Sequence, residues 1–291
     1  MRRVARILWR VARTAVDGWR RHRVPRLGAA LAFYTVLSLA PLVVVAVGVA
    51  SLVFARQQIQ GELIAQLRSL VGPSGAKLAQ TLFDNAYGAY RPSSGMLASA
   101  VGLGALLFGA SAVVAQLKSA LNTIWGAAGG GGLRKAFLNR ILSFALVLGL
   151  GFLLLASLLF NAAVTAFNRY FSHAFGVPAG LLSAVNGAAS FVLTALLIGV
   201  LYRYLPDTAV RWRDVSYGAL LSALLFTVGK WLLGRYLGHS AIASAYGAAG
   251  SLIIVLLWIY YSAQIFFLGA EVARATAQER EANRSPRASP P

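Results

Sequence analysis

The chain has 291 residues, of which 58% are hydrophobic and only 12% are charged. Soluble domains average about 45–50% apolar and about 25% charged residues, so these charges are too few to cover a soluble fold of this size. The charge is also one-sided, with 27 Lys and Arg against 8 Asp and Glu, a formal +19. The absence of cysteine excludes disulfides, thiolate metal sites and a cysteine nucleophile. Composition argues against a cytosolic metabolic enzyme and a disordered basic tail. The excess of basic residues then indicates either a membrane protein or a protein that binds nucleic acid.

Six long apolar stretches succeed one another along the chain. Each covers the roughly 20 residues that cross about 30 Å of hydrocarbon as a helix, and none holds more than two charged residues. Buried helices of a large soluble bundle would need polar faces that these stretches lack. The expected transmembrane helices are 29–55, 95–123, 139–166, 179–203, 215–237 and 246–272. We therefore expect an all-α polytopic membrane protein with six transmembrane helices.

The distribution of basic residues between these stretches predicts an orientation. Nineteen of the 27 lie in the N-terminal segment, the second-to-third and fourth-to-fifth connections and the C-terminal tail, and six lie on the opposite side. Basic residues concentrate in cytoplasmic loops, so both termini should be cytoplasmic. The expected organisation is a basic cytoplasmic or interfacial helix at 1–26, a six-helix transmembrane domain at 27–274 and a disordered cytoplasmic tail at 275–291.

The N-terminal segment 2–23 has the pattern of an amphipathic helix. Its two faces are a basic one and an apolar one, with Arg3, Arg6, Arg10, Arg13 and Arg20 on the first and Val4, Leu8, Val11, Ala15 and Trp19 on the second. Such a helix can lie in the membrane interface against anionic lipid headgroups. A solvated helix that only enforces topology is the alternative. A nucleic-acid partner is not expected, because no recognition fold accompanies the arginines.

Two further connecting segments are distinctive. Residues 56–94 contain two stretches with apolar residues at helical spacing around a Gly-Pro-Ser-Gly breaker, which predicts short amphipathic helices that cap a cavity or rest on the outer leaflet. The four glycines 129–132 lack the Gly-Lys-Ser/Thr ending of a phosphate-binding loop, so a flexible linker is expected there.

The sequence offers no grouping of residues that would support catalysis. The three histidines, His22, His173 and His239, fall in different connections, and His22 is expected on the opposite side of the membrane from the other two. There is no HxH, HExxH or paired-carboxylate motif, so we expect no metal site, no cofactor and no enzymatic activity.

Polar residues inside the apolar stretches are more informative, because burying them in lipid is costly unless they find partners or line a cavity. The sixth stretch carries Trp258, Tyr261, Gln264, Leu268 and Glu271 at spacings of three and four, which places them on one helical stripe. The other polar residues noted are Gln116, Lys118, Asn122, Asn161, Asn186 and Lys230. The flexible stem of Lys118 could reach Glu271. The stripe predicts either a polar pathway for a substrate headgroup or interhelical hydrogen bonds that fix packing, and the sequence leaves both open.

Pro41 lies inside the first stretch, where it should kink the helix and free the carbonyl of Leu37. Because Tyr34, Thr35 and Ser38 are beside this kink, we expect a hinge or a cavity wall. Tyr34 and Ser38 are therefore included among the pathway residues.

Several segments together resemble the YihY/BrkB family of bacterial inner-membrane proteins. They are RLGAALAFYTVLSLAPL at 26–42, the stretch 107–125, FTVGKWLLG at 226–234, AYGAAGS at 245–251 and the stretch 257–271. The motif positions present here are Tyr34, Pro41, Gln116, Asn122, Lys230, Tyr246, Gln264 and Glu271. The resemblance implies six membrane spans. It also implies an association with virulence-linked resistance to killing and with export of lipid-type envelope precursors.

Members of that family also carry the name ribonuclease BN, which this chain's residues do not support. The function expected is transport or export of a lipid-like, amphiphilic cell-envelope substrate, with membrane lipids and envelope-assembly proteins as partners. The alternatives are a membrane scaffold for envelope assembly and, less favoured, a ribonuclease. A cavity lined by Tyr34, Lys118, Gln264 and Glu271 would favour transport, and a solid bundle with all polar groups mutually bonded would favour the scaffold.

Overall fold

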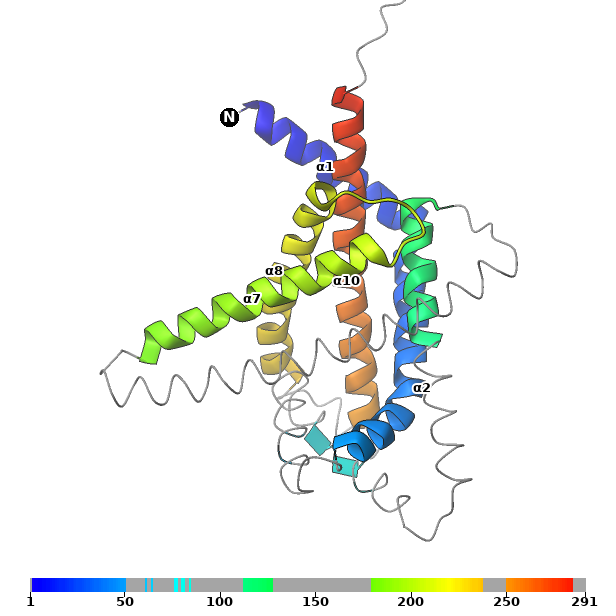
Figure 1. Ribbon diagram of the computed structural model, residues 1–291, viewed down its shortest axis with the longest axis vertical. Helices are drawn as coiled ribbons and strands as arrows, with labels where there is room; N and C mark the ends of the chain where they lie inside the picture. The colour runs from blue at the N-terminus through cyan, green and yellow to red at the C-terminus, as the bar shows by residue number, and fades with distance from the viewer. Residues whose placement is uncertain are drawn as a thin grey trace, which may run out of the picture. The chain divides into compact units, whose positions relative to one another are not determined.

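The computed structural model describes residues 2–50, 112–127, 179–237 and 250–284, together with residues 61, 64, 76, 77, 80, 81 and 84. Within these ranges the secondary structure is helical, with no strand (Figure 1). The expected span 139–166, the glycine run 129–132 and the tail beyond residue 284 lie outside the described residues. The same holds for most of 56–94.

The labelled helices are long, and four of them, α2, α7, α8 and α10, overlap expected apolar stretches. They are α1 (Arg2–Arg21), α2 (Val24–Ala50), α7 (Ala179–Tyr204), α8 (Trp212–Leu237) and α10 (Gly250–Arg284). A further helix covers 112–125. By length and apolar composition, two described stretches can cross a membrane, Gly187–Tyr204 on α7 and Leu252–Ala282 on α10. The count of six spans and the cytoplasmic placement of the termini stay predictions.

The C-terminal boundary expected from hydropathy is wrong. The tail was expected to begin at residue 275, but α10 continues without a break to Arg284. Its extension is held in place by packing and ion pairs: Ala273 and Ala275 are buried, and Arg280 pairs with Asp214. A helix that loses its hydrophobic run can persist when one face still packs, because tertiary contact contributes most of a helix's stability.

Arg23 has an unusual backbone conformation between the end of α1 and the start of α2. Arg23 adopts a positive φ of 51°, and its carbonyl accepts hydrogen bonds from the backbone of Arg26 and Leu27 at the start of α2. Just before it, the His22 amide still bonds back to Gly18 at 2.8 Å. A left-handed conformation costs a residue with a β-carbon about 1–2 kcal/mol.

α2 remains helical through Pro41. Figure 1 shows that α2 changes direction along its course, as a proline inside a helix is expected to cause. The role of Pro41 as a hinge stays a prediction.

The exposed side chains of α8 form an apolar stripe suited to lipid. Tyr217, Leu220, Leu224, Val228 and Leu232 recur every three or four residues and are all exposed. Soluble helices carry polar residues on such a face, so an apolar exposed stripe of this length fits contact with hydrocarbon.

The chain divides into two compact units. One unit comprises Met1–His22, Leu121–Leu224 and Leu268–Pro291, and the other Arg23–Ala120 and Leu225–Phe267. In the first unit α8 and α10 approach closely, because a β-carbon added at Gly218 would overlap the backbone oxygen of Gly269. In the second unit α8 contacts α10 through Phe226 and Trp258, whose ring centroids lie 6.0 Å apart.

Candidate functional site: a polar stripe along α10

The five residues of the expected stripe, Trp258, Tyr261, Gln264, Leu268 and Glu271, all lie within α10. The helix is unbroken over this length, so the three- and four-residue spacing keeps them near one face. Two members carry the polar chemistry, Gln264 and Glu271, and their surroundings differ sharply. Each is described below within its own unit.

Gln264 faces α2 at Gly28. A β-carbon built at Gly28 would overlap Nε2 of Gln264, and the ring of Tyr260 lies 3.6 Å from the same point. The amide oxygen and nitrogen of Gln264 are both buried, and neither has a hydrogen-bond partner among the described residues. An amide can donate two hydrogen bonds and accept two, and the described residues use none of this capacity at Gln264.

Tyr261 fits against a second glycine in the same unit. A β-carbon at Gly229 of α8 would lie 2.8 Å from Cε1 of Tyr261 and 3.1 Å from its hydroxyl oxygen. Small residues allow helices of membrane proteins to approach closely, and here Gly28 and Gly229 admit the two side chains of α10.

Glu271, by contrast, is fully engaged in a polar chain that links α1 to α10. The residue is only 2% exposed, and its Oε1 lies 2.6 Å from Nδ1 of His22, at the end of α1. On the other side of the imidazole, Nη1 of Arg274 lies 2.7 Å from Nε2. Gly18 makes room for the carboxylate, because a β-carbon there would overlap Oε2. We call these three residues, His22, Glu271 and Arg274, the α1–α10 relay.

The protonation of the imidazole in the relay follows from its neighbours. A guanidinium has only N–H donors, so Nε2 of His22 must accept from Arg274. The other nitrogen, Nδ1, then carries the proton and donates it to the carboxylate of Glu271.

Sequence reasoning missed the partners of Glu271. The expected partner was Lys118, which is buried at 8% exposure, and its pairing with Glu271 stays a prediction. The signal that could have found Arg274 is its position three residues after Glu271, which places both on one face of α10. No local pattern connects His22 with Glu271, which is 249 residues away.

Around Pro41, the hydroxyls are satisfied within α2. Ser38 is buried and donates to the Thr35 carbonyl at 2.9 Å, and Thr35 donates to the Leu31 carbonyl at 2.7 Å. Tyr34 is exposed. The structure therefore engages Ser38 and Thr35 locally, and their part in a pathway stays a prediction.

The remaining pathway residues lie on two other helices. Asn122 makes a reciprocal pair with Asp207 in the α7–α8 connection, donating from Nδ2 to Oδ2 and accepting from the Asp207 amide, both at 2.8 Å. This geometry ties the helix 112–125 to that connection. Gln116 on the same helix and Lys230 on α8 are half-buried.

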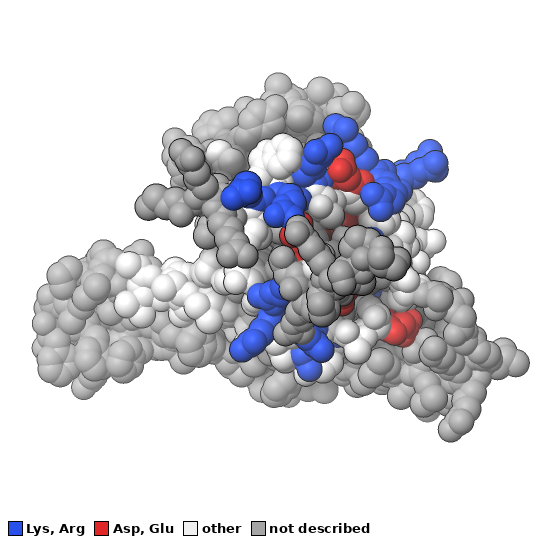
Figure 2. Space-filling model, turned by 90° about the horizontal axis from the view of Figure 1, so that it is seen from above, with Lys and Arg blue, Asp and Glu red and all other residues white. Residues whose placement is uncertain are grey.

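The surface of α1 differs from the expected two-faced helix. Leu8 was expected to share a face with Ala15, but Ala15 is buried, whereas Leu8 and Trp9 are each 64% exposed. The buried face meets α10 at Gly18, so the exposed apolar residues form a separate strip beside the arginines. Arg13 stacks over the Trp9 ring at 5.6 Å. Figure 2 shows Lys and Arg side chains gathered at the end of the molecule where α1 and the end of α10 lie.

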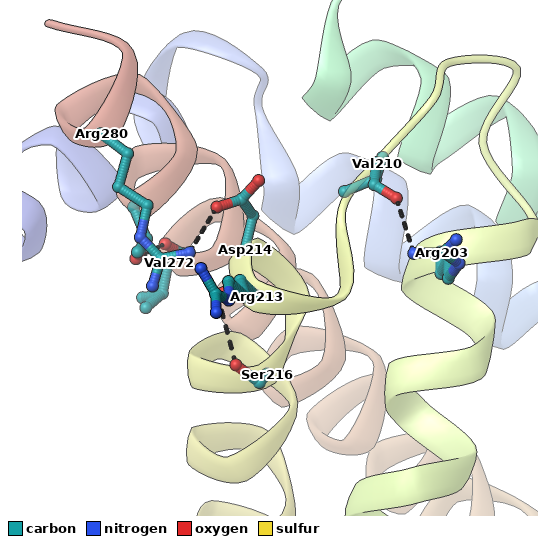
Figure 3. A network of polar contacts seen from close by, with 8 residues as sticks. Arg203, Val210, Arg213, Asp214, Ser216, Val272 and Arg280 are labelled. Atoms are coloured by element: carbon teal, nitrogen blue, oxygen red, sulfur yellow. Dashed lines mark hydrogen bonds and ion pairs between the residues drawn. The ribbon is translucent and has the colours of Figure 1, made fainter. Parts of the chain in front are cut away.

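A second polar network fixes the connection between α7 and α8 (Figure 3). Arg203 donates to the Val210 carbonyl at 3.3 Å and lies over the rings of Tyr204 and Trp212, 5.5 and 5.1 Å from their centroids. Tyr204 and Trp212 are both exposed. Aromatic residues paired with cations are typical of a membrane–water interface, so this connection has the chemistry of one.

The first turn of α8 is anchored to α10 in the same view. Arg280 Nη1 donates to Asp214 Oδ1 at 2.7 Å, and the guanidinium also lies 5.4 Å from the centroid of Tyr217. Asp214 is one of the first residues of α8, where an anion is stabilised by the helix dipole. The pair holds the extension of α10 against the N-terminus of α8.

Two helices that are long and apolar enough to cross a membrane, together with the exposed apolar stripe of α8, fit a helical membrane protein. The profile of the virulence factor BrkB family matches residues 15–291. The chain belongs to that family, and the resemblance seen in the sequence is thereby confirmed.

Curated relatives carry the name UPF0761 membrane protein. The relative from Tolumonas auensis is 30% identical over 284 residues, covering 94% of this chain and 88% of its own length. The relative from Stenotrophomonas maltophilia strain K279a is 30% identical over 269 residues, covering 90% of this chain and 60% of its own length. The one from Ralstonia nicotianae is 28% identical and is covered over 55% of its length. The chain thus spans a little over half of several relatives. No solved structure matches it.

Proposed function

We propose that the protein transports or exports a lipid-like, amphiphilic cell-envelope substrate in the bacterial inner membrane, with both termini cytoplasmic. The observation that carries the proposal is the Gln264 amide, whose two polar atoms are buried and without a hydrogen-bond partner among the described residues. Leaving a buried amide unpaired costs about 1–3 kcal/mol. A substrate headgroup that bonds this amide would remove that cost.

The chemistry of the surroundings suits an amphiphile. The amide fills the space beside the Gly28 backbone that a side chain would occupy, and the aromatic ring of Tyr260 lies close to the same point. A headgroup with hydrogen-bonding groups and an apolar tail matches these surroundings.

The partners proposed are membrane lipids, anionic headgroups above all, and envelope-assembly proteins. Exposed Leu8 and Trp9 beside the exposed arginines of α1 support an anionic membrane surface, because apolar insertion and charge attraction reinforce each other. The basic excess is thereby assigned to lipid, and no nucleic-acid partner is proposed.

A scaffold without a substrate is the second candidate, and mutual bonding of polar groups favours it. The pair of Tyr202 and Ser222, at 2.9 Å, and the pair of Asn122 and Asp207 satisfy each other. The α1–α10 relay does the same for Glu271. Gln264 is the residue at which the two candidate functions predict different behaviour.

We also propose that the protein is not an enzyme and holds no metal. Among the described residues no group of three or more His, Cys, Asp or Glu is placed to hold a metal ion. The test for the ribonuclease alternative is direct: purified full-length protein should leave RNA intact with added Mg²⁺ or Mn²⁺. Cleavage that is lost when the protein is removed would contradict the proposal.

The transport proposal is tested with a pair of variants that make one chemical change at two places. Gln264→Leu removes the buried amide, whereas Gln278→Leu makes the same change on the same helix at an exposed position. In a strain lacking the gene, mass spectrometry of membrane extracts should show one amphiphile class accumulating. The wild type and Gln278→Leu should reverse this accumulation, and Gln264→Leu should not, although it is present and folded. A scaffold predicts that Gln264→Leu restores the wild-type pattern.

A further inference from the structure

The exposed face of the first half of α8 presents its side chains in the same order as the parts of a phospholipid. Four exposed residues follow one another at spacings of four, three and four: Arg213, Tyr217, Leu220 and Leu224. Residues at this spacing lie on one face of a helix. The face begins with a cation, continues with an aromatic ring that has a polar end, and finishes with two aliphatic side chains. We call it the Arg213 face, and all of it belongs to the first compact unit.

The length of the Arg213 face matches one leaflet of a membrane. Eleven residues separate Arg213 from Leu224. At about 1.5 Å per residue they extend over about 16 Å, close to half of the roughly 30 Å thickness of the hydrocarbon core. The headgroup and acyl chains of a single lipid molecule occupy a similar length, so one molecule can follow the whole face.

The guanidinium of Arg213 is placed to meet an anion. The side chain is exposed, and none of the ion pairs among the described residues involves it. The neighbouring carboxylate of Asp214 is buried and already accepts from Arg280 at 2.7 Å (Figure 3). Arg280 also lies over the Tyr217 ring, 5.4 Å from its centroid, so a second cation borders the face. The polar end of the Arg213 face is therefore positively charged.

Arg203, at the end of α7, differs from Arg213 because its neighbours already engage it. Its guanidinium lies over the rings of Tyr204 and Trp212 and donates to the Val210 carbonyl. Arg213 makes no such contact among the described residues. Of these two arginines, Arg213 is the one whose donors face solvent and lipid.

We propose that the Arg213 face binds one anionic glycerophospholipid, with the phosphate on Arg213, the glycerol and ester groups beside Tyr217, and an acyl chain along the two leucines. A guanidinium can form two parallel hydrogen bonds with a phosphate. Tyrosine rings favour the level of the headgroups. A zwitterionic lipid brings a cation next to Arg213 and Arg280, which repel it, so charge complementarity selects the anionic lipid.

This lipid site goes beyond the proposed transport function. It uses neither the Gln264 amide nor the exposed surface of α1, and it requires only that the chain lies in a membrane. A substrate bound at Gln264 leaves the occupancy of the Arg213 face unchanged. The two proposals therefore stand or fall by separate measurements.

The test places a fluorophore on the Arg213 face and a quencher on the lipid. Because the chain has no native cysteine, a bimane label is attached to full-length protein at Leu220→Cys. The protein is reconstituted in phosphatidylcholine vesicles in which a fixed minor share of the lipid carries bromine on its acyl chains. The brominated lipid is either phosphatidylglycerol or phosphatidylcholine. A bound acyl chain quenches the label, so phosphatidylglycerol should quench it more strongly at equal share.

A second label and two variants make the result specific to the face. Leu196 on α7 is exposed and lies seven residues from Arg203, as Leu220 lies seven residues from Arg213. Since Arg203 is already engaged, a label at Leu196→Cys should be quenched equally by both lipids. With the label at Leu220→Cys, Arg213→Gln should lower the affinity for phosphatidylglycerol relative to phosphatidylcholine about fivefold, the contribution of one arginine near a membrane surface. Arg211→Gln alters an exposed arginine that precedes α8 and should retain the preference.

A preference for phosphatidylglycerol at Leu220→Cys that only Arg213→Gln removes would establish the site. The proposal is overturned if both lipids quench Leu220→Cys equally, or if Leu196→Cys shows the same preference. It is also overturned if Arg213→Gln retains the preference or if Arg211→Gln loses it, because the general positive charge of the connection would then be sufficient.

Discussion

Gly269 on α10 has no room for a side chain, so a single added methyl group should disturb the packing there. A β-carbon there would overlap the Ser222 hydroxyl and would lie 2.6 Å from the Tyr202 hydroxyl and 2.7 Å from the backbone oxygen of Gly218. Tyr202 and Ser222 are both fully buried and bonded to each other at 2.9 Å. None of these atoms is the free end of a flexible side chain, so Gly269→Ala must separate α8 from α10 or break the hydroxyl pair.

The expected decrease in the free energy of unfolding of Gly269→Ala can be estimated from three contributions. Overpacking a close-packed site costs about 1–3 kcal/mol. Loss of the hydrogen bond between Tyr202 and Ser222 adds about 1 kcal/mol in a membrane protein. Replacing glycine by alanine inside a helix returns about 1 kcal/mol. Gly269→Ala should therefore destabilise the protein by about 2 kcal/mol.

Gly187→Ala on α7 is the matched control. A β-carbon at Gly187 has no neighbour within 4 Å, so the variant keeps the gain in helix propensity and adds no clash. The gain in helix propensity is the same in both variants and cancels when they are compared. Their free energies of unfolding should therefore differ by about 3 kcal/mol.

The assay is reversible unfolding of purified protein in mixed micelles by titration with a denaturing detergent, followed by tryptophan fluorescence. Gly269→Ala should unfold at a much lower concentration of denaturing detergent than Gly187→Ala. Adding Ser222→Ala to Gly269→Ala should recover part of the loss, because it removes the atom nearest to the new methyl group. Equal stability of the two alanine variants would show that α8 and α10 do not cross at Gly269.

Three smaller effects follow from other contacts. Asn122→Ala removes both bonds to Asp207, and because the pair is exposed it should cost only about 1 kcal/mol in the same unfolding assay; an unchanged midpoint would refute the pairing. Arg23→Gly relieves the positive φ and should be neutral or stabilising by up to about 1 kcal/mol, whereas a loss of stability would mean that the side chain matters more than the backbone. Asp214→Asn weakens the ion pair with Arg280 and the helix-dipole interaction, so it should cost about 1 kcal/mol at low salt and less at 1 M salt; a salt-independent loss would contradict the electrostatic origin.

The helices themselves were largely predictable from the sequence. The expected spans 179–203 and 215–237 agree with α7 and α8 to within a few residues, because hydropathy reports directly on the length of chain that avoids water. Hydropathy did not predict the last part of α10, where the helix continues beyond its apolar residues. The extension of α10 to Arg284 depends on buried alanines and on the pair of Arg280 and Asp214, neither of which gives a hydropathy signal.

The stripe on α10 was predictable from spacing, but the partners of its members were not. Periodicity places Gln264 and Glu271 on one face of their own helix and carries no information on what lies opposite. Gly28 and His22 come from chain segments more than 200 residues away, and they meet α10 only after the fold has formed. For the same reason the apolar face of α1 was expected as one surface, although Ala15 is buried and Leu8 and Trp9 are exposed.

The central claim is that the buried amide of Gln264 receives the polar end of an amphiphile. The most direct measurement is a structure determined in native membrane particles, without exposure to detergent. The account predicts elongated density whose polar end lies within hydrogen-bond distance of Nε2 or Oε1 of Gln264 and whose tail follows apolar side chains. An amide bonded entirely to protein groups, with no amphiphile beside it, would contradict the account and favour the scaffold.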